Sequence, residues 1–150
     1  MRILLAATLL LSTAAAAQDI QPGKWEVRST AIDLTIPGTP AFMLRMAKGK
    51  TRTEQKCVAP AQARRGMAAL LIPDPKAKCQ VESQQVAAGR YAQALTCPQR
   101  DGRPMRVTRT GSYDAASFTG RLVMAGDTKK GAMNVVVDQA GRRTEGGCKN

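Results

Sequence analysis

From Lys24 onward, apolar and polar residues alternate with a period of two, and turn residues recur at short intervals. Such alternation places successive side chains on opposite faces of a β-strand, and repeated short strands are typical of an antiparallel all-β domain. In the first strand, Trp25 and Val27 alternate with charged residues, and the apolar set then changes parity. We therefore expect a β-bulge near Thr30–Ala31, because one extra residue keeps a single face buried.

The same pattern predicts about eight strands. They are residues 24–36, 50–58, 79–86, 90–97, 104–113, 117–124, 132–138 and 142–148. Short segments rich in Gly, Asp and Ala separate them and suit hairpin loops, residues 139–141 being the last of these. This count predicts a mainly β protein, built as a single antiparallel curved sheet or a half-open barrel, with one short helix.

Residues 61–71 are the expected helix. Pro60 suits a first helical turn, and the prolines that follow residue 72 prevent the helix from continuing. We expect Met67, Leu70 and Leu71 to pack onto one side or end of the sheet.

The first 17 residues have the pattern of a cleaved signal peptide, because Arg2 precedes an apolar run and small residues that end at Ala17. The apolar run is too short for a good membrane-spanning helix, and no second one follows, so we expect no transmembrane segment in the mature chain. Residues 18–150 are expected to form a single disulfide-bonded domain of a periplasmic or secreted protein.

Four cysteines, Cys57, Cys79, Cys97 and Cys148, lie in the part expected to be exported, where thiols are normally paired. Cys79–Cys97 with Cys57–Cys148 is the favoured pairing, because the first two would face each other across a hairpin. Cys57–Cys79 with Cys97–Cys148 stays open. The expected strand directions would gather all four sulfurs at one rim. A zinc site is a remote alternative, since no C-x₂-C pair occurs.

The chain has 23 Lys and Arg against 11 Asp and Glu, and it has no histidine. The positive charge favours anionic partners, but nucleic acid is disfavoured because the basic residues are scattered and aromatic residues for base stacking are few. Without histidine the usual general base and the commonest metal ligand are missing, and the acids are spread singly. We therefore expect no enzyme, no cofactor and no metal site.

Several segments together resemble one family. They are Gln21-Pro22-Gly23-Lys24-Trp25-Glu26, Ile36-Pro37-Gly38-Thr39-Pro40, Cys57-Val58-Ala59-Pro60, Cys79, Cys97 and Gly147-Cys148. They resemble DUF3617, a family of exported envelope proteins of unknown function that begin with Pro-Gly-x-Trp-Glu. The resemblance implies a periplasmic or secreted β-rich protein and implies no reaction.

The main functional hypothesis is a non-enzymatic envelope protein that binds a small apolar ligand or an anionic envelope surface. Trp25 is a possible ligand contact, although a single Trp in a chain so poor in aromatics is better explained as the centre of the core. The alternatives are an enzyme with an unrecognised carboxylate or Lys site, and a purely structural or protein-interaction role.

Overall fold

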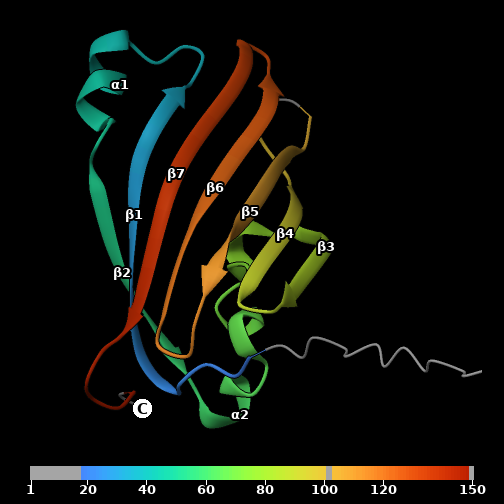
Figure 1. The fold of residues 1–150 in the computed structure, drawn as a ribbon. Helices are drawn as coiled ribbons and strands as arrows, with labels where there is room; N and C mark the ends of the chain where they lie inside the picture. Colours follow the sequence, from blue (N-terminus) through green and yellow to red (C-terminus); the bar gives the residue numbers. More distant parts are fainter. Residues whose placement is uncertain (1–17, 101–102, 149–150) are drawn as a thin grey trace, which may run out of the picture.

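The computed structural model describes residues 18–100 and 103–148, which form one antiparallel sheet of seven strands (Figure 1). The expected signal segment, residues 1–17, lies outside the described residues. The strands are β1 Gly23–Thr35, β2 Thr51–Val58, β3 Gln80–Ala87, β4 Arg90–Cys97, β5 Met105–Tyr113, β6 Ser117–Thr128 and β7 Gly131–Arg143. Their order is β2-β1-β7-β6-β5-β4-β3, which leaves β2 and β3 as open edges. The expected mainly β class and single antiparallel sheet are therefore confirmed.

The expected number of about eight strands is corrected to seven, because residues 139–141 form no turn. β7 continues through this segment and pairs on both sides, with Gln139 opposite Ser29 of β1 and Gly120 of β6. Gly141 serves packing instead, since a Cβ built on it would overlap the ring of Phe118. The two strands expected at 132–138 and 142–148 are thus one strand followed by a short tail.

The disulfides in the structure are Cys79–Cys97 and Cys57–Cys148, which is the favoured pairing. The expectation that all four sulfurs share one rim is wrong. With one strand fewer, β7 runs antiparallel to β4, so Cys148 and Cys97 lie toward opposite ends of the sheet. Each disulfide therefore closes a different end of the sheet.

The bulge in β1 occurs one residue after the expected position. Ala31 pairs with Val137 of β7 and Asp33 with Val136, so one extra residue is accommodated between Ala31 and Asp33. The shift places Leu34 opposite Val135 and returns an apolar side chain to the face that carries Trp25.

The expected helix over residues 61–71 is corrected to two shorter elements. They are α2, Pro60–Ala63, and the 3₁₀ turn η1, Gly66–Ala69; a second 3₁₀ turn, η2, spans Pro75–Ala77. The α-helix cannot continue through Gly66, whose φ is +61°. Met67, Leu70 and Leu71 are nevertheless buried, as expected. The sequence pattern did not reveal helix α1, Ala41–Ala47, which lies at the opposite end of the sheet from α2 (Figure 1).

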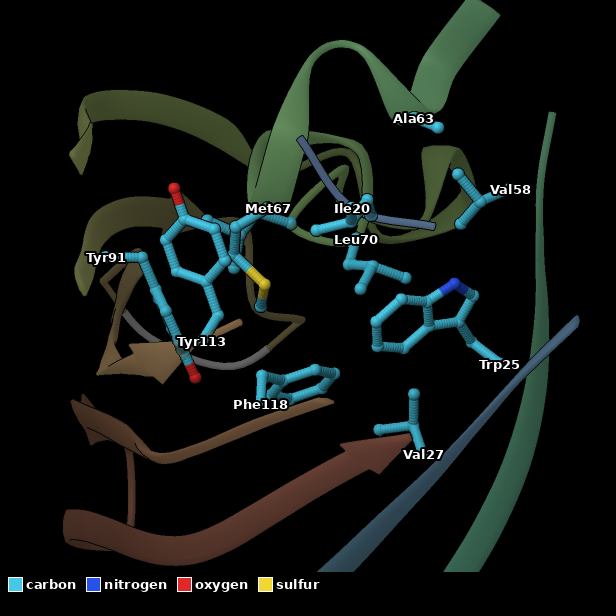
Figure 2. Close-up of a cluster of buried hydrophobic side chains, with 11 residues drawn as sticks. Ile20, Trp25, Val27, Val58, Ala63, Met67, Leu70, Tyr91, Tyr113 and Phe118 are labelled. Carbon is cyan, nitrogen blue, oxygen red and sulfur yellow. The ribbon is translucent and has the colours of Figure 1, made fainter. Parts of the chain in front are cut away.

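The main core lies where α2 and η1 cover one face of the sheet, which we call the apolar face. Trp25 is fully buried there, with its ring centroid 6.4 Å from that of Phe118. The rings of Tyr91 and Phe118 are nearly perpendicular, with their centroids 6.3 Å apart. Figure 2 shows Met67 and Leu70 packed against these aromatic side chains. The opposite face, the polar face, carries Thr, Ser, Arg and Asp side chains, because alternate residues of each strand point there.

The turn between β5 and β6 is closed by the carboxylate of Asp114. Its Oδ1 accepts hydrogen bonds from the backbone N–H groups of Ala116 and Ser117 at 2.8 and 2.7 Å, and its Oδ2 accepts from the Ser117 hydroxyl at 2.8 Å. The backbone hydrogen bond from Ala116 and the bonds from Ser117 lower the pKa of Asp114, because they stabilise the charged form.

We expect Asp114→Ala to lower the free energy of unfolding by about 1 kcal/mol at neutral pH, since these turn hydrogen bonds are lost. Because the pKa of Asp114 is lowered in the folded state, its contribution is complete above the ordinary pKa and is lost as the pH falls through the folded value. Urea denaturation of both proteins across the acid range measures this. The difference between them should shrink below about pH 4, and a difference independent of pH would contradict the assignment.

Candidate functional site

A wide hollow of about 1220 Å³ lies over the polar face. Thr51 of β2 and Gln85 of β3 both line it, although these strands are the two edges of the sheet. The sheet therefore curls toward this face. Hydroxyl and guanidinium groups dominate the lining, with Thr110, Thr119 and Arg121 among them.

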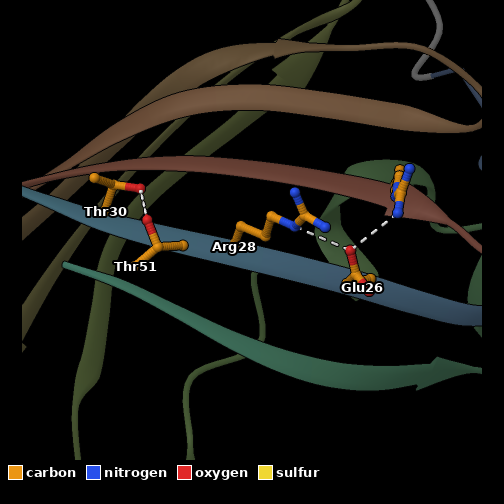
Figure 3. A network of polar contacts seen from close by, with 5 residues as sticks. Glu26, Arg28, Thr30 and Thr51 are labelled. Atoms are coloured by element: carbon orange, nitrogen blue, oxygen red, sulfur yellow. Dashed lines mark hydrogen bonds and ion pairs between the residues drawn. The ribbon is translucent and has the colours of Figure 1, made fainter. Parts of the chain in front are cut away.

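Most charges of the polar face have partners. Glu26 accepts from Arg28 at 3.1 Å and from Arg142 at 3.3 Å (Figure 3). Arg121 donates to both carboxylate oxygens of Asp138, at 2.7 and 3.1 Å, and these hydrogen bonds lower the pKa of Asp138. Several guanidinium groups of the polar face are thus paired with carboxylates of the same face, although Arg28 and Arg142 share the single carboxylate of Glu26.

A second hollow, the apolar groove, has a volume of about 750 Å³ and lies on the apolar face beyond the part that α2 and η1 cover. Leu95, Val107 and Leu122 form its floor with the half-buried Met105 and Met124. Residues 73–79 and 97–100 form its walls, and the Cys79–Cys97 disulfide joins these two segments.

The chain leaves this groove open because of its prolines. After Leu71 reaches the middle of the apolar face, Pro73 and Pro75 prevent a longer helix that would cover the rest of the strands. The chain instead continues through η2 to Cys79, along one side of the apolar floor. Basic side chains surround the groove, because Lys76, Lys78, Arg100 and Arg109 line it, and among the described lining residues Asp74 alone is acidic.

The strand pattern brings the charged residue Arg109 onto the apolar face. In β5, the alternation through Met105 and Val107 places the Arg109 side chain on the same face as these two. One terminal nitrogen of its guanidinium donates to the carbonyl oxygen of Leu71 at 3.4 Å. Its Nε–H is buried and has no hydrogen-bond partner among the described residues. Among those residues, no carboxylate lies within 4.0 Å of it.

Burial lowers the pKa of the Arg109 guanidinium, and the nearby Tyr91 and Glu54 partly oppose this shift. An arginine side chain stays protonated at neutral pH even so, because its ordinary pKa lies far above that range. The groove therefore has a permanent positive charge on a side chain that is only partly exposed to water.

Gln93 of β4 lies directly opposite Arg109 and is only 3 % exposed. Its Nε2 donates to the Leu71 carbonyl at 3.0 Å and to Oε1 of Gln84 at 2.7 Å. Its own Oε1 is buried without a partner. An unpaired donor and an unpaired acceptor thus occupy cross-strand neighbours, of which Arg109 lines the groove and Gln93 lies buried behind it.

The residues that the sequence singled out are separated in the structure. Trp25 donates its indole N–H to the Gln21 carbonyl at 3.0 Å and lines neither hollow. Cys79 and Cys97 line the apolar groove, whereas Cys57 and Cys148 lie at the other end of the sheet.

The acids do not come together. Among the described residues, several acids each pair with a Lys or Arg: Glu26 with Arg28, Asp33 with Lys48, Glu54 with Lys56, Glu82 with Arg106 and Asp138 with Arg121. Asp101 lies outside the described residues. Within residues 18–100 and 103–148, no three Cys, Asp or Glu side chains gather as a metal site would require.

Sequence reasoning missed Arg109, although a signal for it exists. In the strand expected at 104–113, one parity reads Met105, Val107, Arg109, Gly111 and Tyr113. A single charged residue on an otherwise apolar strand face is either exposed by an irregularity in the strand or buried because it has a function.

A comparison with protein-family models matches residues 20–148 to a family described as a protein of unknown function, DUF3617. No curated protein and no solved structure matches the chain. Within the part of the chain that the structure describes, no helix combines the length and the apolar character that crossing a membrane requires.

Proposed function

The chain belongs to the DUF3617 family, and from that premise we propose that it is an exported, non-enzymatic envelope protein that binds a small apolar ligand with an acidic head group. The ligand lies in the apolar groove, with its hydrocarbon part on Leu95, Val107 and Leu122 and its acid group beside Arg109. The signal-like N-terminal pattern supports export, and so do the two disulfides, which persist in oxidising compartments.

The unpaired Nε–H of Arg109 is the observation that carries this proposal. A buried donor without a partner costs free energy, and a carboxylate or phosphate oxygen would satisfy it with a charge-assisted hydrogen bond. The planar guanidinium also suits the two oxygens of an acid better than a single hydroxyl. The groove volume of about 750 Å³ lies in the range of small-molecule sites.

A non-enzymatic role is supported by the chemistry of the side chains. The sequence contains no histidine, and several of the described acids are paired with basic residues on strand faces. The groove offers an apolar floor and a border of basic side chains with Asp74 among them, a set suited to holding and orienting an acidic ligand.

A ligand pair that differs only in its head group tests the proposal. We expect the wild-type protein to bind dodecanoic acid about ten- to a hundredfold more tightly than dodecanol, measured by displacement of a fluorescent fatty acid, because only the acid pairs with Arg109. Arg109→Met should remove this preference and keep the weaker binding of the alcohol, since methionine retains apolar bulk in the groove.

Arg106→Met is the matched control. Arg106 lies on the same strand but on the opposite face, exposed and 3.4 Å from the carboxylate of Glu82, so the same substitution there should leave the acid preference intact. Equal binding of acid and alcohol by the wild-type protein, or an equal loss of preference in both variants, would overturn the proposal.

A further inference from the structure

Helix α1 exposes an apolar surface that the fold does not use. Phe42, Met43 and Met46 are 57, 50 and 67 % exposed, and none of the seven residues of α1 is buried. These are three of the five large apolar side chains that are exposed in the described residues. We call them the α1 patch. Exposed apolar side chains that are gathered on one short helix indicate a contact surface, whereas single ones scattered over a protein are ordinary.

The sheet holds α1 in a fixed position. At the C-terminal side of the helix, Gly49 donates its N–H to the Ala31 carbonyl at 2.7 Å, and the Ala31 N–H donates to the Lys50 carbonyl at 3.1 Å. On the other side, the loop that precedes α1 packs on the β6–β7 turn, where Pro37 faces Gly131. Helix α1, which carries the patch, is therefore attached to the sheet on both sides and lies at one end of the molecule (Figure 1).

Basic residues lie within and next to the segment that carries the α1 patch. Arg45 lies on the helix, Lys48 and Lys50 follow it directly, and Lys130 lies beside Gly38 in the preceding loop. Asp33 is 3.7 Å from Lys48. The whole chain carries a formal net charge of +12. An apolar patch bordered by cations complements a surface that is apolar inside and anionic at its border.

We propose that α1 docks the protein onto an anionic phospholipid bilayer, with Phe42, Met43 and Met46 in the interface and the neighbouring Lys and Arg side chains at the head groups. A second copy of the chain fits this surface poorly. The helix is only about 10 Å long, whereas a stable interface buries about 800 Å² on each partner, and two copies would bring like charges together.

Docking is independent of ligand binding, because no residue of α1 lines the apolar groove. The two surfaces are nevertheless at the same end of the sheet. Thr35, just before α1, pairs with Asn134, and Met124 at the groove pairs with the adjacent Val135. A bilayer bound to α1 would thus lie at the end of the sheet where the apolar groove also lies.

Vesicle flotation tests the docking. The full mature chain should float with vesicles of phosphatidylglycerol and phosphatidylethanolamine and should stay behind with phosphatidylcholine vesicles. The double variant Phe42→Ser, Met46→Ser should bind the anionic vesicles about tenfold more weakly or worse, because two apolar side chains no longer enter the interface. Both residues are exposed, so circular dichroism should show an unchanged fold.

The matched control replaces the two exposed apolar residues that lie outside α1. Ile72→Ser with Val81→Ser should leave vesicle binding unchanged. A Phe42→Trp variant reports the insertion directly, since its emission should shift to shorter wavelength on anionic vesicles. The fully buried Trp25 of the wild-type protein should not respond.

Three results would overturn the proposal. They are absence of binding to the anionic vesicles, binding that the Phe42→Ser, Met46→Ser variant retains, and a concentration-dependent dimer of the wild-type protein that this variant abolishes. The last result would identify a second copy of the chain as the occupant of the α1 patch. None of these results bears on the acid preference expected for the apolar groove. The vesicle experiment and the Arg109→Met experiment can therefore each contradict its own proposal without contradicting the other.

Discussion

Replacing Cys57 and Cys148 together by alanine should lower the free energy of unfolding by about 4–5 kcal/mol. The bond joins residues 91 positions apart, so it removes much of the freedom of the unfolded chain. The Cys79–Cys97 bond spans only 18 positions, and its loss should cost about 3 kcal/mol by the same argument. Domains of this size are stable by only about 5–15 kcal/mol, so the first variant should lose a large fraction of its stability.

Urea denaturation of the two double-alanine variants measures this difference. Each variant is the control for the other, because both lose one disulfide and two sulfur atoms. The Cys57→Ala, Cys148→Ala variant should have the lower midpoint, since its bond ties the tail after β7 to the end of β2. A lower midpoint for the Cys79→Ala, Cys97→Ala variant would contradict the account.

Replacing Trp25 by alanine should lower the free energy of unfolding by about 3–5 kcal/mol, which is the usual cost of a large cavity in a core. Trp25 is fully buried, stacks on Phe118, and donates its indole N–H to Gln21, so truncation empties the centre of the main cluster. Denaturant unfolding measures the loss. Trp25→Phe keeps an aromatic ring against Phe118 and should cost less.

The Trp25 variants also separate the core from the ligand site. Because Trp25 does not line the apolar groove, Trp25→Phe should keep the preference for dodecanoic acid over dodecanol. A lost preference in this folded variant would mean that Trp25 takes part in ligand binding.

Local alternation was enough to predict most of the sheet. The strands around Trp25, Tyr91 and Phe118 alternate clearly, so their faces and approximate bounds follow from the sequence. The bulge in β1 could also be predicted, because the change of parity after Ser29 exposes apolar residues unless an extra one is inserted. The hairpin from Cys79 to Cys97 brought its two cysteines together for the same reason.

The error at residues 139–141 has a tertiary cause. The sequence around Gly141 predicts a turn, but Gly141 is a strand residue whose missing side chain makes room for Phe118. Nothing near Gly141 in the sequence indicates that a ring from β6 will lie over it. That one misplaced turn added a strand, reversed the direction of the C-terminal segment and placed the disulfides at a common rim.

The two candidate sites could be predicted from the sequence even less well than the number of strands, because they depend on contacts between distant segments. Arg109 matters because Leu71, from a distant segment, and the facing strand β4 bury its Nε–H. The α1 patch matters because no element of the described chain covers Phe42 or Met46. The sequence pattern alone does not show that other segments bury Arg109, or that none of the described elements covers Phe42 and Met46. Both depend on the path of the chain in three dimensions.

The central claim is that the apolar groove holds an acid group at Arg109. The most direct measurement is a titration of ¹⁵N-labelled protein with dodecanoic acid, observing the arginine Nε–H resonances by NMR. The account predicts that the Arg109 Nε–H signal shifts in a saturable manner, together with the methyl signals of Leu95, Val107 and Leu122. Shifts confined to the polar face, such as those of Arg28 and Arg121, with Arg109 unchanged, would contradict it.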